Sequence, residues 1–137
     1  MIRWKDTYSV NVEEIDNQHK KLFEIGGRLY DLSSLKDDFD HYDEIMDIIG
    51  ELRDYTIYHF NFEEELLKKN GYEEIENHSI EHDFFVKKLK RIEKKDIDGQ
   101  QGQTIMEITE FLIDWVSSHI LKSDMQYKPY LNSKGVY

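Results

Sequence analysis

The chain has 137 residues, with 29 Asp and Glu against 18 Lys and Arg, a formal net charge of −11, six histidines and no cysteine. This length fits one domain spanning residues 1–137, and the lack of cysteine excludes disulfides, thiolate metal sites and cysteine nucleophiles. The acidic balance disfavours nucleic acid, and no apolar run reaches the roughly 20 residues of a membrane-spanning helix, so we expect a cytoplasmic protein without membrane insertion.

Four segments place apolar residues at the three-then-four spacing of amphipathic helices. They cover about residues 12–35, 42–70, 73–95 and 103–124. Asn70-Gly71 indicates a helix stop, because glycine adopts the left-handed conformation without steric cost. Residues 96–102 are polar and indicate a loop.

Four such helices with short connections favour an all-α fold, an up-down-up-down four-helix bundle. Residues 1–11 form an N-terminal arm, and residues 125–137 form a short C-terminal tail without a clear period. Both contain aromatic residues, so we expect them to pack on the bundle.

Five of the six histidines lie on the predicted apolar stripes, and each helix contributes at least one. They are joined on the second stripe by Glu63, one turn after a histidine. The set is His19, His59, Glu63, His78, His82 and His119. A single histidine on such a stripe is usually a hydrogen-bonded core residue. Six buried polar groups without partners would cost about 6–18 kcal/mol, against a typical stability of about 5–15 kcal/mol. Because neutral imidazoles cannot all pair with one another, the pattern predicts a metal site.

The spacing supports a shared site. His59 and Glu63 are four residues apart, as are His78 and His82, so each pair lies on one helix face. In an up-down-up-down bundle, all of these positions fall near the same end. Five histidines and a carboxylate exceed the usual needs of one ion, so two ions that share carboxylates are favoured. Imidazole and carboxylate ligands without sulfur suit iron, manganese or zinc.

Asp124 is not predicted by the helical period. It lies five residues after His119, about 140° around an ideal α-helix, whereas Ser123 would lie closer to the histidine face. By this criterion Asp124 is a solvated acid at a helix end, unless the helix bends or unwinds there.

The chain resembles the hemerythrins, in particular single-domain bacteriohemerythrins. The resemblance rests on four segments in order, from about Trp4 to Leu131. They are Ile15-Asp-Asn-Gln-His19, His59-Phe-Asn-Phe-Glu63, His78-Ser-Ile-Glu-His82 and His119-Ile-Leu-Lys-Ser-Asp124.

The resemblance implies reversible O2 binding at a non-haem diiron centre, for oxygen storage, delivery or sensing. It implies that His78, His82 and His119 bind one iron and that His19 and His59 bind the other. Glu63 and Asp124 would bridge the two ions, beside an oxo or hydroxo group.

Four apolar neighbours are expected to form the wall of an O2 pocket, or else to be ordinary core residues: Leu22, Phe60, Trp115 and Val116. Two positions depart from the family's usual residues. Asn11 replaces a common glycine and also tolerates the left-handed conformation, and Leu67 replaces a common methionine of similar volume.

Two other functions stay open. The site could consume peroxide or nitric oxide as an enzyme, although no acid or base accompanies the predicted ligands. The bundle could also hold a structural or stored metal such as zinc. A monomer is compatible with the sequence, which leaves the oligomeric state and any protein partner undetermined.

Overall fold

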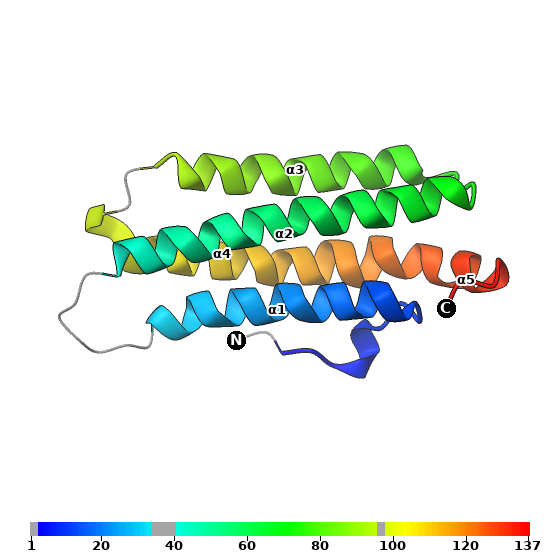
Figure 1. The fold of residues 1–137 in the computed structure, drawn as a ribbon, viewed down its shortest axis with the longest axis horizontal. Coiled ribbons are helices and arrows are strands. Elements are labelled where there is room, and N and C mark those ends of the chain that lie inside the picture. Colours follow the sequence, from blue (N-terminus) through cyan, green and yellow to red (C-terminus); the bar gives the residue numbers. More distant parts are fainter. Residues whose placement is uncertain (1–2, 34–40, 96–97) are drawn as a thin grey trace.

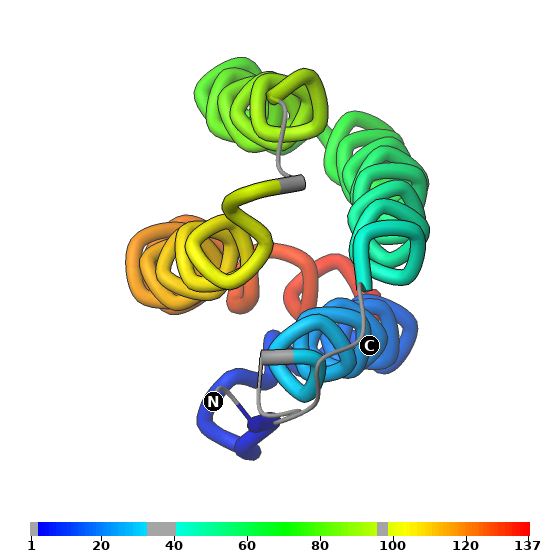
Figure 2. Tube along the Cα trace, turned by 90° about the vertical axis from the view of Figure 1, so that its left-hand side faces the viewer, coloured from blue at the N-terminus to red at the C-terminus, as the bar shows by residue number. Residues whose placement is uncertain are grey.

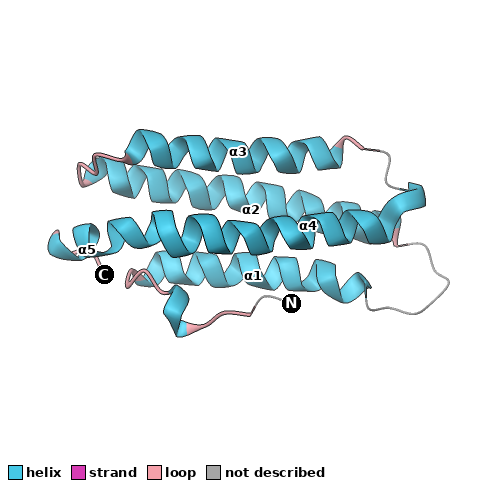
Figure 3. Ribbon diagram, turned by 180° about the vertical axis from the view of Figure 1, so that it is seen from behind, coloured by secondary structure: helices cyan, strands magenta, loops and turns pink. Residues whose placement is uncertain are grey.

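The structure, a computed structural model, describes residues 3–33, 41–95 and 98–137. In this part of the chain every regular element is helical (Figure 3). The elements are η1 (Asp6–Tyr8), α1 (Glu13–Ser33), α2 (Tyr42–Lys69), α3 (Ile75–Glu93), η2 (Asp98–Gln100), α4 (Gln101–Trp115), η3 (Val116–Asp124) and α5 (Met125–Ser133).

The four long helices run antiparallel to their neighbours and form the predicted bundle (Figure 1). Viewed along the bundle, α1, α2, α3 and α4 follow one another around a central core (Figure 2). α2 packs on α1 and α3, and α1 packs on α4. None of the helices in the described ranges is long and apolar enough to cross a membrane.

The turn between α2 and α3 forms as predicted. Gly71 has a φ of 72°. The Tyr72 N–H donates to the Leu67 carbonyl and the Gly71 N–H donates to the Lys68 carbonyl. This is the Schellman pattern, which satisfies the last carbonyls of α2. The turn therefore reverses the chain within a few residues and places the end of α2 beside the start of α3.

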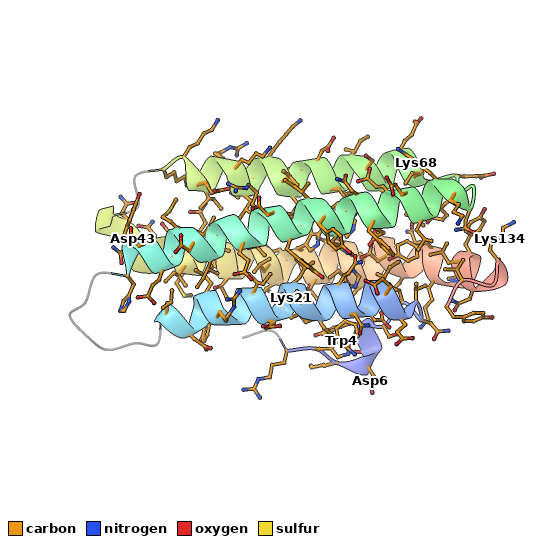
Figure 4. The ribbon with its side chains drawn as sticks, viewed as in Figure 1. Trp4, Asp6, Lys21, Asp43, Lys68 and Lys134 are labelled. Atoms are coloured by element: carbon orange, nitrogen blue, oxygen red, sulfur yellow. The ribbon has the colours of Figure 1, made fainter. Side chains whose placement is uncertain are left out.

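The core has two parts. The larger one fills the bundle between the four helices, and the smaller one lies at the end where α5 packs. Side chains from all four helices occupy the bundle interior (Figure 4). The N-terminal arm contacts α1 through Trp4, whose ring lies 5.8 Å from that of Phe23 and 5.9 Å from that of Tyr8.

The C-terminal segment is more regular than its sequence suggests. Residues Met125–Ser133 form helix α5, with Tyr127 and Leu131 fully buried. These two residues follow Asp124 at the helical spacing of three and then four. The five-residue step from His119 to Asp124 breaks the helical spacing of the preceding stripe. For this reason the spacing within residues 125–133 does not stand out in the sequence. The expected packing of this segment on the bundle is confirmed. The four expected helix starts, and the expected ends near residues 70 and 95, agree within two residues. The fourth segment is α-helical only to Trp115 and continues as η3 to Asp124, and the expected end near Leu35 lies outside the described residues.

Candidate metal centre

The residues singled out on the apolar stripes lie together at the end of the bundle where α5 packs. His19 comes from the start of α1, and His59 and Glu63 from the end of α2. His78 and His82 come from the start of α3, and His119 from η3. Each is at most 3% exposed. Each of these four helical segments therefore contributes one or two polar side chains to a single buried level of an otherwise apolar bundle.

Asp124 also lies in this cluster, fully buried, so the α-helical expectation of a solvated acid is wrong. Residues Val116–Asp124 form a π-helix. Its hydrogen bonds join residues five apart, so Asp124 stacks on the face of His119. Ser123, which an α-helix would have placed nearer that face, instead donates to Glu81 Oε1 at 2.9 Å.

The two carboxylates face a three-histidine group, defined as His78, His82 and His119. Glu63 Oε1 lies 2.5 Å from His78 Nε2 and 3.3 Å from His82 Nε2. Asp124 Oδ1 lies 2.9 Å from the Nε2 atoms of both His78 and His119. The Nε2 atoms of His82 and His119 are 3.1 Å apart. Five donor atoms from five residues thus surround one small volume.

The other oxygens of the same carboxylates face a two-histidine group, defined as His19 and His59. Glu63 Oε2 lies 3.2 Å from His59 Nε2 and 3.8 Å from His19 Nε2. Asp124 Oδ2 lies 3.3 Å from His19 Nε2. Each carboxylate therefore divides its two oxygens between the two histidine groups.

The donor atoms fit cations better than they fit one another. Several buried atoms of the cluster have no hydrogen-bond partner in the described structure: Glu63 Oε2, both Asp124 oxygens, both His19 ring nitrogens and His119 Nδ1. Apart from His19 Nδ1, each lies 2.9–3.8 Å from an atom that can carry the opposite charge but forms no hydrogen bond with it. Unpaired buried polar groups cost about 1–3 kcal/mol each, and cations between these atoms would remove that cost.

Without metal, the cluster balances its charges internally. Burial lowers the pKa of His19 and His78, but the nearby Asp124 and Glu63 carboxylates raise it more, to about 9 and about 10 respectively. Burial raises the pKa of Glu63 and Asp124, yet the surrounding imidazoles bring both well below their ordinary values. The two carboxylates therefore stay ionised and are compensated by imidazolium.

Sequence reasoning missed the residues that contact the outer sides of the imidazoles. Gln18 Oε1 lies 2.7 Å from His59 Nδ1, and Glu64 Oε2 lies 3.1 Å from His82 Nδ1. Gln18 is nearly fully buried, which is unusual for glutamine. Only its place beside His19 in the sequence could have suggested a role.

Tyr127 was also missed, although its aromatic character predicted that it would pack on the bundle. Its ring lies 5.6 Å from that of His78, and its buried hydroxyl has no hydrogen-bond partner among the described residues. Burial, together with the charges of Asp124 and Glu63, raises the pKa of Tyr127 well above its usual value. The phenol therefore stays protonated beside the carboxylates.

Three of the four predicted pocket residues line an apolar cavity of about 30 Å³ between α1 and α4. Leu22 lies one turn after His19, and Trp115 and Val116 lie one turn before His119. Phe60 is not among the lining residues and instead stacks on His82, with ring centroids 4.0 Å apart. About 10–15 Å³ is enough to hold one water molecule, so the cavity can take a small diatomic molecule.

The sixth histidine, His41, lies outside the cluster. It precedes α2, and its Nδ1 atom lies 3.2 Å from Glu44 Oε1.

Comparisons with known proteins indicate one family. The family described as the Hemerythrin HHE cation binding domain matches residues 10–131. A bacteriohemerythrin of Clostridium acetobutylicum is 43% identical over 129 residues, which cover 93% of this chain and 98% of that protein. A bacteriohemerythrin of Methylococcus capsulatus is 32% identical, with 92% of each chain covered.

Structural similarity points the same way. The crystal structure of a wild-type hemerythrin superposes with a TM-score of 0.79 at 31% identity, covering 94% of this chain and 96% of the other. A family match over most of the chain, together with relatives above 30% identity along nearly their full length, shows that the chain belongs to the hemerythrin family.

Proposed function

We propose that this protein binds O2 reversibly at two iron ions held by the buried cluster. The observation that supports it best is the division of the carboxylate oxygens. Glu63 Oε1 and Asp124 Oδ1 face the three-histidine group, whereas Glu63 Oε2 and Asp124 Oδ2 face the two-histidine group. A carboxylate placed in this way bridges two ions. The family matched by the chain is a cation-binding one, and its relatives include bacteriohemerythrins.

The residues would act as follows. His78, His82 and His119 would hold one iron, His19 and His59 the other, and Glu63 and Asp124 both. Reduced iron bound there would supply the electrons that hold O2 and would recover them when O2 leaves. Since the two-histidine group offers one imidazole fewer, an ion held by it would have room for an added ligand.

The apolar cavity supports a carrier. Its lining is apolar apart from Thr109, and Trp115 stacks on His119 with ring centroids 4.0 Å apart. Such a lining admits an uncharged gas and excludes water. Water would promote oxidation of the iron and protonation of the bound ligand. We propose Leu22, Trp115 and Val116 as its wall, with Phe60 holding His82.

The test is an absorption spectrum of protein loaded anaerobically with Fe²⁺. Metal analysis should give two irons per chain, and air should produce a visible band that disappears under vacuum. His19→Ala should lose the band, whereas the matched control His41→Ala should keep it. Permanent oxidation on first contact with air would contradict the carrier function.

The same sample separates the alternatives. Steady-state consumption of peroxide or nitric oxide, abolished by His19→Ala, would indicate an enzyme. Isolation of the native protein with zinc in place of iron would indicate a structural site. We further propose that residues 1–137 act as one cytoplasmic domain. Size-exclusion chromatography with light scattering will measure the oligomeric state of the protein.

A further inference from the structure

The outer nitrogens of the imidazoles, which face away from the shared carboxylates, have different partners in the two histidine groups. In the three-histidine group, two of the three outer nitrogens lie near acids. His82 Nδ1 lies within hydrogen-bond distance of Glu64 Oε2, at 3.1 Å, and His119 Nδ1 lies 3.6 Å from Glu81 Oε1 without a hydrogen bond. Glu81 is held there by the Ser123 hydroxyl, which donates to the same oxygen at 2.9 Å.

In the two-histidine group, no acid among the described residues forms a hydrogen bond with an outer nitrogen. His59 Nδ1 lies 2.7 Å from the amide oxygen of Gln18, which is 2% exposed. The Gln18 amide nitrogen donates to Glu14 Oε1 at 3.0 Å, and this bond fixes the amide with its oxygen toward the imidazole. His19 Nδ1 has no hydrogen-bond partner in the described structure.

This difference changes how strongly each imidazole binds a cation. A carboxylate that accepts the Nδ1 hydrogen makes Nε2 a stronger donor, and it does so more than a neutral amide oxygen. Partners of this kind typically change metal affinity by about 10–100-fold. The three-histidine group has one more imidazole, one acid within hydrogen-bond distance of an imidazole (Glu64), one acid near a second imidazole (Glu81), and the same shared carboxylates.

We propose that the two metal positions fill in a fixed order, the three-histidine position first, and that Glu64, Glu81 and Gln18 are the positioning residues that set this order. The inference rests on the proposed dinuclear site. At low metal supply the protein then holds one ion, bound by His78, His82 and His119, and the two-histidine position is the one that gains and loses its ion.

The test uses the full chain, freed of metal and titrated with Co²⁺ alone. Calorimetry should resolve two binding steps of different affinity. Nuclear magnetic resonance should locate each ion, because Co²⁺ shifts the Nδ1 proton signals of its histidine ligands far outside the normal range. The first equivalent should shift signals of the three-histidine group, and the second should shift those of His59 and His19.

Matched variants test the acidic partners. Glu64→Gln keeps the side-chain shape and should weaken the first step by about 10–100-fold, with little change in the second. Glu65→Gln removes the same charge from the neighbouring exposed residue and should change neither step. Gln18→Glu should strengthen the second binding step and so reduce the difference in Co²⁺ affinity between the two steps. Circular dichroism checks that each variant is folded.

Three results would overturn the proposed order: simultaneous filling, first filling of the two-histidine position, or a loss in Glu64→Gln no larger than in Glu65→Gln. These results differ from a failure of the proposed function. Saturation with one Co²⁺ per chain would refute the dinuclear site itself, whereas two ions bound without order would refute only the order.

Discussion

Asn11 determines the backbone conformation of the chain just before the first helix of the bundle. Its φ is 55°, in the left-handed region, two residues before the start of α1 at Glu13. Its side-chain Nδ2 donates to Asn132 Oδ1 at 2.9 Å, and Asn132 Nδ2 donates to the Asn11 carbonyl at 3.1 Å. The expectation that asparagine tolerates this conformation is confirmed. The pair of bonds also joins the N-terminal arm to α5.

Asn11→Ala should lower the free energy of unfolding by about 1–2 kcal/mol, because alanine adopts the left-handed conformation at that cost and loses the bond to Asn132. Asn11→Gly should lose the same bond but no strain, so its loss should be smaller. Urea unfolding measures both. Equal losses in the two variants would show that the backbone conformation contributes nothing.

Gly26 allows α1 and α4 to approach closely. A Cβ atom built there would lie 2.9 Å from Leu112 Cδ1, whereas one built at Gly50 would meet nothing closer than 3.9 Å. Both glycines lie inside helices, where alanine is favoured by about 1 kcal/mol. The two positions therefore differ mainly in the space around them.

Gly50→Ala should raise the free energy of unfolding by about 0.5–1 kcal/mol. Gly26→Ala should lower it by about 1 kcal/mol, because overpacking outweighs the gain in helix propensity. Denaturant unfolding of the two variants side by side decides this. A gain at Gly26 as large as that at Gly50 would mean that Leu112 moves away without cost.

At the scale of elements, η3 is the segment that places Asp124. A sequence period of 3.6 residues identified five of the cluster residues because they lie on α-helices: His19, His59, Glu63, His78 and His82. It also identified His119, which lies near the start of η3, four residues after the last residue of α4, Trp115. It failed for Asp124 because a π-helix depends on local packing that no periodic pattern reveals. The resemblance to the hemerythrins included this residue, since it rests on motif spacing and assumes no helix type. Side-chain contacts such as Gln18 with His59 were beyond the sequence, since they depend on how the helices are rotated.

A swap of neighbours tests the π-helix. The double variant Ser123→Asp, Asp124→Ser moves the carboxylate to the position that an α-helix would turn toward His119. We expect it to bind fewer Co²⁺ ions than the natural protein, like its control Asp124→Ser, because residue 123 faces Glu81 instead. Calorimetry gives the stoichiometry. Recovery of two ions in the double variant would contradict the π-helical geometry.

At the scale of the whole molecule, the buried cluster makes stability depend on pH. In the metal-free protein, the raised pKa values of His19 and His78 add stability below pH 6.5, and this is lost as the pH rises through about 9 to 10. The lowered pKa values of Glu63 and Asp124 add stability above their ordinary values of 4.5 and 3.8, and this is lost on acidification. The metal-free protein should therefore be most stable at about pH 5–6.5.

Above pH 6.5, the stabilisation that bound metal gives should increase with pH, whereas the stability of the metal-free protein decreases. The reason is that the imidazoles must lose their protons before they bind a cation. The rise in Tm produced by excess Co²⁺ should be larger at pH 8.5 than at pH 6. Thermal unfolding with and without Co²⁺ measures this difference. His19→Ala, which lacks one of the protonated groups, should show a weaker trend. A rise in Tm independent of pH would contradict the protonation of the cluster.

The four-helix origin of the donor set also has a kinetic consequence. His19 and Asp124 are separated by most of the chain, so bringing them together requires that almost every long-range contact of the bundle already exists. We therefore expect the metal centre to form only after the main barrier to folding has been passed. Bound metal should leave the folding rate nearly unchanged and lower the unfolding rate. The metal-loaded protein should then stay folded longer because it unfolds less often.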